Sequence, residues 1–182
     1  MTTMTHNQQL ARQIYQTARI TGEFLLRSGA ISHQYFDKYL FEANPILLKQ
    51  IAAAMQTLVP ESGIDALAGL EMGGIPIVTM LSQVTGLPAL FVRKKAKEYG
   101  TCKLAEGGEI NGRNLLIIED VVTSGGQILL SAADLRQRGA IVDMVLCVID
   151  REAGGKEKLA AAGLQLRPLF TMTQLEEAAQ SS

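Results

Sequence analysis

The chain has 182 residues, 47% of them hydrophobic, and a formal net charge of −1 at pH 7. This length suits a single domain over residues 1–182, and the balanced charge lacks the basic excess that nucleic-acid binding usually requires. No apolar run approaches the roughly 18 residues of a membrane span, and the polar start of the chain has no apolar signal core. We therefore expect a cytoplasmic protein with neither a membrane nor a nucleic-acid partner.

The order of apolar patterns predicts an α/β protein with a mostly parallel central sheet flanked by helices. An amphipathic pattern predicts a helix over 7–20, and β-rich runs at 22–27 and 32–39 predict a hairpin outside the main sheet. We expect this N-terminal hood to span about 1–40 and the core about 44–182. Pro45 opens a predicted helix to about 58. The remaining predicted strands are 65–70, 88–92, 115–118, 141–149 and 164–170, and the remaining helices are about 75–84, 128–137, 156–162 and 174–179.

Residues 114–127 combine a buried strand, two adjacent carboxylates and a Gly-rich turn that leads into a helix. Glu119 and Asp120 fall at the carboxyl end of the strand, where open α/β sheets place their ligands. The turn supplies hydroxyls and unhindered backbone N–H groups at a helix N-terminus, which favour an anion. Two carboxylates repel a bare anion but accept hydrogen bonds from sugar hydroxyls, so we expect a phosphorylated sugar. The stretch after the carboxylates consists of Val121, Val122, Thr123, Ser124, Gly125, Gly126 and Gln127.

This segment resembles the phosphoribosyl pyrophosphate (PRPP) motif of the type I phosphoribosyltransferases, two acidic residues followed by a Thr-[Ser/Ala/Gly]-Gly turn. The alternative is an ordinary acidic strand end before a Gly-softened helix. A Walker-type nucleotide loop is excluded because no Lys follows the glycines. The resemblance implies the type I phosphoribosyltransferase fold and PRPP binding by residues 119–127.

A second signal is the polar loop that follows the predicted strand 88–92. It begins with a cluster of cations, which in isolation is commonly a solvated surface. The pattern Arg-Lys-x-x-Lys-x-Tyr-Gly resembles the mobile catalytic loop of the orotate phosphoribosyltransferases, with Tyr99 at the aromatic position. The resemblance implies that this loop binds PRPP and reaches across a homodimer interface into the neighbour's site. The residues it assigns to catalysis are Lys97, Arg93, Lys94 and, from the central motif, Asp120.

The resemblance extends to three further segments. Leu-Arg-Ser-Gly at 26–29 implies that Arg27 binds PRPP, and the aromatic pair Tyr35 and Phe36 implies a surface for a pyrimidine. Asp-Arg-Glu at 150–152 resembles the segment whose Arg holds the orotate carboxylate, which a guanidinium can bond bidentately. We therefore assign orotate to Tyr35, Phe36, Thr123 and Arg151. An ordinary surface cation is the alternative for both arginines.

One segment departs from the family pattern. Many members carry Tyr-Lys ahead of Gly-Ile-Pro, and this chain has Met72 and Gly73 there. The missing Lys removes one expected pyrophosphate cation, although the backbone N–H groups of 72–74 can still bind an anion. We assign Met72 and Gly73 to PRPP; altered PRPP use is the alternative.

The resemblance implies an enzyme that converts orotate and PRPP to orotidine 5′-monophosphate and pyrophosphate in de novo pyrimidine (UMP) biosynthesis. It implies Mg²⁺ as cofactor, held mainly by PRPP and water without dedicated protein ligands. Two alternatives stay open: a purine or uracil phosphoribosyltransferase, and a non-catalytic PRPP-sensing regulator. Cys102, Cys147 and the lone His33 are not expected to be catalytic.

Overall fold

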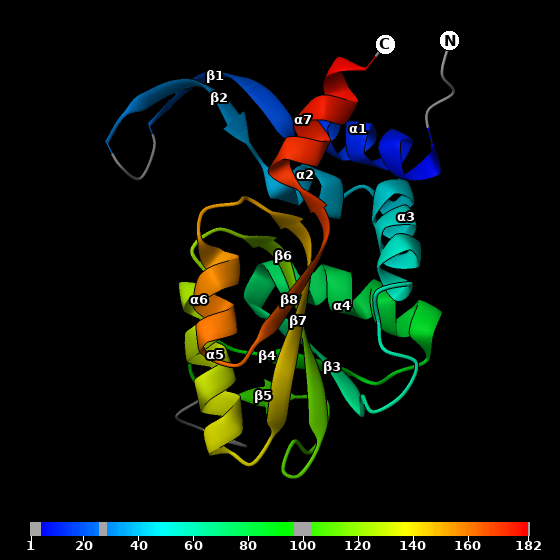
Figure 1. Cartoon of the computed structure of the whole chain (residues 1–182), viewed down its shortest axis with the longest axis vertical. Coiled ribbons are helices and arrows are strands. Elements are labelled where there is room, and N and C mark those ends of the chain that lie inside the picture. Colours follow the sequence, from blue (N-terminus) through cyan, green and yellow to red (C-terminus); the bar gives the residue numbers. More distant parts are fainter. Residues whose placement is uncertain (1–4, 26–28, 97–102, 182) are drawn as a thin grey trace.

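A computed structural model describes residues 5–25, 29–96 and 103–181, and it has a central sheet with helices on both faces (Figure 1). The sheet has six strands in the order β5-β4-β3-β6-β7-β8, and only β5 is antiparallel to its neighbour. This topology confirms the predicted mostly parallel α/β fold. The strands are β3 (Ala66–Leu70), β4 (Ala89–Val92), β5 (Ala105–Glu106), β6 (Asn114–Val122), β7 (Ile141–Asp150) and β8 (Gln165–Thr171).

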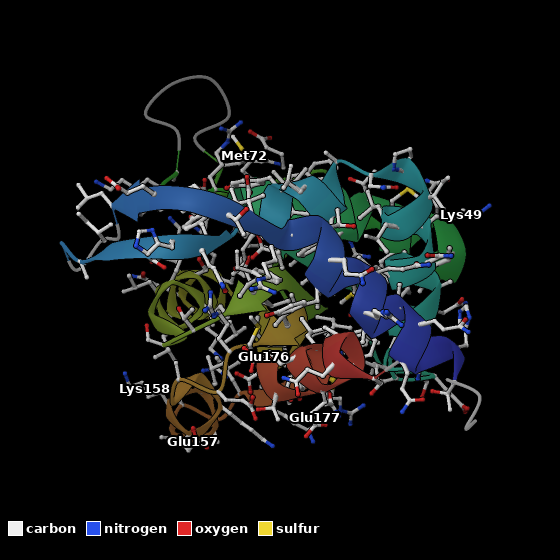
Figure 2. The ribbon with its side chains drawn as sticks, turned by 90° about the horizontal axis from the view of Figure 1, so that it is seen from above. Lys49, Met72, Glu157, Lys158, Glu176 and Glu177 are labelled. Carbon is white, nitrogen blue, oxygen red and sulfur yellow. The ribbon has the colours of Figure 1, made fainter. Side chains whose placement is uncertain are left out.

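Two hydrophobic clusters, one on each face of the sheet, explain the unbroken apolar run in β6. Leu116 and Ile118 pack into the cluster formed with α1, α3, α4 and α7, whereas Leu115 and Ile117 pack into the cluster formed with α5 and α6. A strand buried on both faces needs apolar side chains at every position. The helices are α1 (His6–Ala18), α3 (Pro45–Gln56), α4 (Glu71–Thr85), α5 (Gly126–Gln137), α6 (Gly155–Ala161) and α7 (Met172–Gln180). Figure 2 shows Met72 of α4 and Glu157 of α6 on opposite sides of the molecule.

The hood is a separate antiparallel hairpin of β1 (Arg19–Leu25) and β2 (Ile31–Phe36), and it projects from the α1 end of the core (Figure 1). The predicted second strand ran too far, because a short helix, α2 (Lys38–Glu42), follows it. The Asp37 side chain caps this helix by accepting a hydrogen bond from the Tyr39 N–H at 3.1 Å, and the buried Phe41 anchors it to the core. This helix brings hood residues over the carboxyl end of β6.

Two other boundaries differ from the predictions at the same end of the sheet. Helix α4 begins at Glu71 rather than after the glycines, since glycines at 73 and 74 let its first turn press against β6. A Cβ on Gly74 would lie 2.5 Å from the Ile118 carbonyl oxygen. The predicted loop after β4 contains the two-residue strand β5, which is too short to leave a periodic signal.

Candidate active site

The two carboxylates of the central motif lie at the carboxyl end of β6 with a lysine from α2 beside them. Asp120 is only 1% exposed, and its carboxylate forms an ion pair with Lys38 of α2 and accepts the Val121 N–H. Burial lowers the pKa of Lys38, but the hydrogen bond and charge of Asp120 outweigh it and raise that pKa overall. Burial first, and Asp120 second, raise the pKa of Glu119 well above its ordinary value. The site therefore holds a compact ion pair at a water-poor sheet edge.

A third carboxyl group, which the sequence did not reveal, lies under this pair. Glu42 of α2 is 6% exposed, and burial together with the neighbouring Asp120 raises its pKa to about 9. If Glu42 and Asp120 were both ionised, there would be no hydrogen to form a bond between their oxygens. Within the described ranges, neither carboxyl oxygen of Glu42 has another hydrogen-bond partner. A protonated Glu42 can donate to Asp120, so Glu42 is neutral at pH 7.

Replacing Glu42 with Gln should remove a pH dependence of stability. Because the folded pKa of about 9 lies above the ordinary value of 4.5, the stability tied to the neutral carboxyl is complete below pH 4.5. It is lost as pH rises towards 9, by at most about 1.4 kcal/mol per pH unit. The advantage of Glu42→Gln over the parent should therefore grow between pH 6 and pH 8 in urea unfolding. An equal difference at both pH values would contradict this, and Glu157→Gln on α6 is the exposed control.

The Gly-rich turn after β6 has the geometry of an anion site. Gly125 has φ 70° in the left-handed region and is the N-cap of α5, so the first N–H groups of that helix are free of intrahelical partners. Helix α6 packs directly beneath the turn, since a Cβ on Gly155 would overlap the Thr123 carbonyl oxygen. The turn is thereby held rigidly at the end of β6.

Hood and core together enclose a cavity of about 270 Å³ beside this turn. The four residues assigned to orotate from the sequence all line it: Tyr35, Phe36, Thr123 and Arg151. The Arg151 guanidinium lies 6.0 Å from the centre of the Phe36 ring. An aromatic ring and a cation at this separation suit a planar, anionic ligand. Asp37, Lys38, Tyr39 and Val121 complete the lining.

The turn after β7 fixes where Arg151 lies. The Arg151 N–H donates to the Val122 carbonyl at 2.8 Å, which ties the turn to β6. Glu152 follows with a left-handed φ of 56°, and its carboxylate accepts the N–H and the hydroxyl of Thr173 at 3.0 and 2.6 Å. These bonds lower the pKa of Glu152. Sequence reasoning missed Thr173, because nothing local marks a partner from α7.

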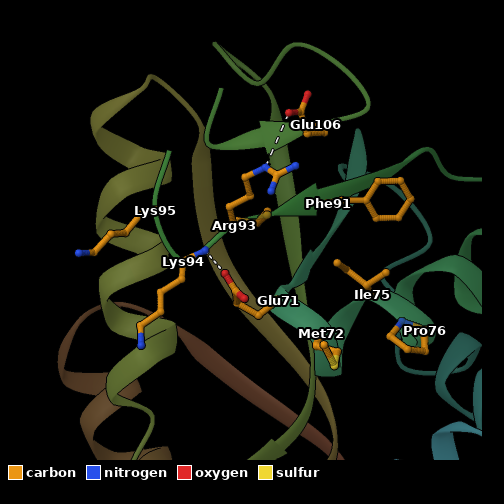
Figure 3. Close-up of a pocket in the computed structure, with 10 residues that line it drawn as sticks. Glu71, Met72, Ile75, Pro76, Phe91, Arg93, Lys94, Lys95 and Glu106 are labelled. Atoms are coloured by element: carbon orange, nitrogen blue, oxygen red, sulfur yellow. Dashed lines mark hydrogen bonds and ion pairs between the residues drawn. The ribbon is translucent and has the colours of Figure 1, made fainter. Parts of the chain in front are cut away.

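A second cavity, of about 490 Å³, borders the first turn of α4 on the side away from Asp120 (Figure 3). Arg93 and Lys94 border it together with Glu71, Met72 and Phe91. The Lys94 N–H donates to the Glu71 carboxylate, and the Arg93 Nε lies 3.7 Å from the Glu106 carboxylate. The Lys95 side chain points away from Glu71 and Met72 (Figure 3).

Gly73 connects the two halves of the site. A Cβ on this residue would overlap the Asp120 carboxylate and lie 2.9 Å from the Lys38 Nζ. The first turn of α4 therefore contacts Asp120 of the acidic pair through Gly73, and it contacts Lys94 of the basic segment 93–95 through Glu71. Three predicted site residues, Arg27, Lys97 and Tyr99, lie outside the described ranges, as does Cys102.

Three further features of the described residues bear on the function. Burial raises the pKa of the free Cys147 thiol well above its ordinary value. In the part of the chain that the structure describes, no group of three or more His, Cys, Asp or Glu residues could hold a metal ion. No helix there is long and apolar enough to cross a membrane.

Comparisons with known proteins agree on one family. Residues 40–164 match the phosphoribosyl transferase domain. The orotate phosphoribosyltransferase of Nocardioides sp. is 52% identical over 98% of this chain and 99% of its own length, and that of Methanocella arvoryzae is 40% identical over 92% and 95%. The structure of Mycobacterium tuberculosis orotate phosphoribosyltransferase with inorganic phosphate has a TM-score of 0.83 at 26% identity, covering 93% of this chain and 98% of that one. The chain belongs to the orotate phosphoribosyltransferase family.

Proposed function

We propose that the protein transfers the ribose 5-phosphate of PRPP to orotate, giving orotidine 5′-monophosphate and pyrophosphate in UMP biosynthesis. The observation that carries this proposal is the convergence of three parts at one sheet edge. These parts are the acidic pair on β6, the left-handed glycine turn, and the cavity lined by Phe36 and Arg151. A sugar phosphate with an anionic planar base needs all three.

Each part has a distinct task in the proposed reaction. Glu119 and Asp120 accept hydrogen bonds from the ribose hydroxyls, while residues 121–127 surround the 5-phosphate with N–H and hydroxyl donors. Tyr35 and Phe36 pack on the pyrimidine, Thr123 contacts it, and Arg151 pairs with its carboxylate. Arg27, Met72, Gly73, Arg93, Lys94, Lys97 and Tyr99 serve the phosphates of PRPP.

Catalysis rests on placement and charge rather than on a strong base. Orotate N1 attacks ribose C1 as an anion, having lost its proton to water, while the bond to pyrophosphate breaks, so positive charge develops on the ribose and negative charge on the leaving group. Asp120 faces the ribose, and Arg93, Lys94 and Lys97 offset the charge of the pyrophosphate; fixed charges of this kind contribute several kcal/mol.

Mg²⁺ fits this site in a limited role. The carboxylate oxygens of Glu119 and Asp120 are hard donors suited to Mg²⁺, but no group of three or more His, Cys, Asp or Glu side chains among the described residues is placed to form a metal cage. PRPP oxygens and water would supply most ligands, and the bound ion would neutralise pyrophosphate charge. We further propose a cytoplasmic homodimer whose loops complete each other's sites.

A comparison of bases tests the proposed function and separates its alternatives. Purified protein with PRPP and Mg²⁺ should consume orotate and release pyrophosphate, with little turnover of uracil or adenine. Faster use of either of those bases would favour a different base specificity. Binding of PRPP without turnover of any base would indicate a regulator.

Arg151→Ala should raise the KM for orotate much more than the KM for PRPP. A lost charge-assisted pair costs about 2 kcal/mol, or roughly thirtyfold in KM. Arg138→Ala is the control, because Arg138 is an exposed arginine at the far end of α5. Steady-state kinetics with each substrate varied gives the answer, and an equal rise in both KM values would refute the assignment of Arg151 to the carboxylate.

A further inference from the structure

Lys38 lies directly between the carboxylates of the acidic pair, Glu119 and Asp120, and the first turn of α4. Its ammonium pairs with Asp120, lies 2.9 Å from the point where a Cβ on Gly73 would stand, and borders the 270 Å³ cavity. Its side chain is 33% exposed, so it is neither locked in the core nor free in solvent. No sequence pattern assigned it to the site.

We propose that Lys38 is a substrate-contacting residue that leaves Asp120 for the pyrophosphate of PRPP and so provides, from α2, the cation that position 73 lacks. The inference rests on the proposed function, since it takes PRPP as the ligand. It adds Lys38 to the residues assigned to PRPP, and it adds a change of partner for Lys38 from Asp120 to pyrophosphate.

The local packing explains why this cation comes from α2. Gly73 has no room for a side chain, because a Cβ there would overlap the Asp120 carboxylate. The capping of α2 by Asp37 and the burial of Phe41 instead direct Lys38 to the same point. Because Gly73 has no side chain, the Lys38 ammonium can occupy the space beside Asp120.

Substrate binding supplies the reason for the exchange. Ribose hydroxyls that donate to Asp120 compete with Lys38 for the same carboxylate oxygens. The displaced ammonium would then lie beside the first-turn N–H groups of α4, which carry partial positive charge and favour an anion. A pyrophosphate bound there gains a second, mobile source of positive charge. The nearby Glu42 does not compete for Lys38, because burial keeps its carboxyl protonated.

The proposal makes opposite predictions for two ligands that share a ribose 5-phosphate. Lys38→Met keeps most of the aliphatic stem and removes the charge. It should weaken PRPP at least tenfold, whereas orotidine monophosphate, which has no pyrophosphate, should bind as well as before or more tightly because Asp120 is released. Lys38→Arg should retain PRPP affinity within a fewfold. Lys49→Met, on the exposed side of α3, is the matched control (Figure 2).

Calorimetry with both ligands at one Mg²⁺ concentration decides the matter, on variants shown folded by circular dichroism. Lys38→Gln replaces Lys38→Met if the latter does not fold. If the variant loses the same affinity for both ligands, Lys38 acts only through Asp120. If it loses affinity for orotidine monophosphate alone, Lys38 contacts the base. Either result overturns the proposal, and so does unchanged affinity for PRPP. Failure of the parent protein to bind PRPP or to consume orotate would instead refute the proposed function.

Discussion

Gly125→Val should abolish the binding of PRPP and of orotidine monophosphate together while the protein remains folded. Gly125 has a left-handed φ of 70°, which a β-branched residue adopts at a penalty of about 1–2 kcal/mol. A Cβ would lie 3.2 Å from Leu159, so packing at this position is already tight. The added methyl groups would also prevent a phosphate from approaching the backbone N–H groups. Both ligands carry the same ribose phosphate, so both should lose affinity.

Gly86→Val provides the matched control for this variant. Gly86 ends α4 with a left-handed φ of 73°, and nothing lies within 4 Å of a Cβ built on it. The two variants therefore carry a similar backbone penalty, but only one of them is at the proposed phosphate site. Calorimetry on both proteins separates strain from site damage. Retained affinity for orotidine monophosphate in Gly125→Val would mean that the phosphate binds elsewhere.

The sequence predicted the parts of the site that a continuous segment encodes. The apolar run of β6, its two carboxylates and the glycine turn are adjacent along the chain, so their order alone indicated a strand end followed by a helix N-terminus. Predicted and observed strands agree within a few residues for the parallel sheet, because a strand buried on both faces leaves a strong apolar signal.

The parts that sequence reasoning missed depend on contacts between distant segments. Nothing local to Lys38 indicates that it pairs with Asp120, and α2 itself is a five-residue helix that depends on its Asp37 cap and on Phe41. The buried carboxyl of Glu42 looks like a surface acid in the sequence. Its neutral state follows from its burial in the folded protein and from the neighbouring Asp120. Such pairings arise from tertiary structure and leave no periodic pattern.

Lys97→Ala should lower turnover by about 100- to 1000-fold, the range observed when one preorganised hydrogen-bond donor to a developing anion is removed. PRPP binding should remain measurable, because Arg93 and Lys94 remain in place. Lys158→Ala is the control, because Lys158 is an exposed lysine of α6 that does not line the 490 Å³ cavity. Rapid-mixing measurements of kcat with saturating substrates test the prediction, and an unchanged kcat would refute a catalytic role for Lys97.

Hybrid dimers test whether Lys97 serves the neighbouring subunit. A chain with Lys97→Ala keeps a complete acidic pair, and a chain with Asp120→Asn keeps a complete loop, so each variant alone should be nearly inactive. If loops act across the interface, every hybrid contains one intact site, and random mixing should restore about one quarter of the parent activity. If loops act within their own chain, no hybrid contains an intact site. Two affinity tags isolate the hybrids, and the absence of activity in them would show that each site is built from a single chain.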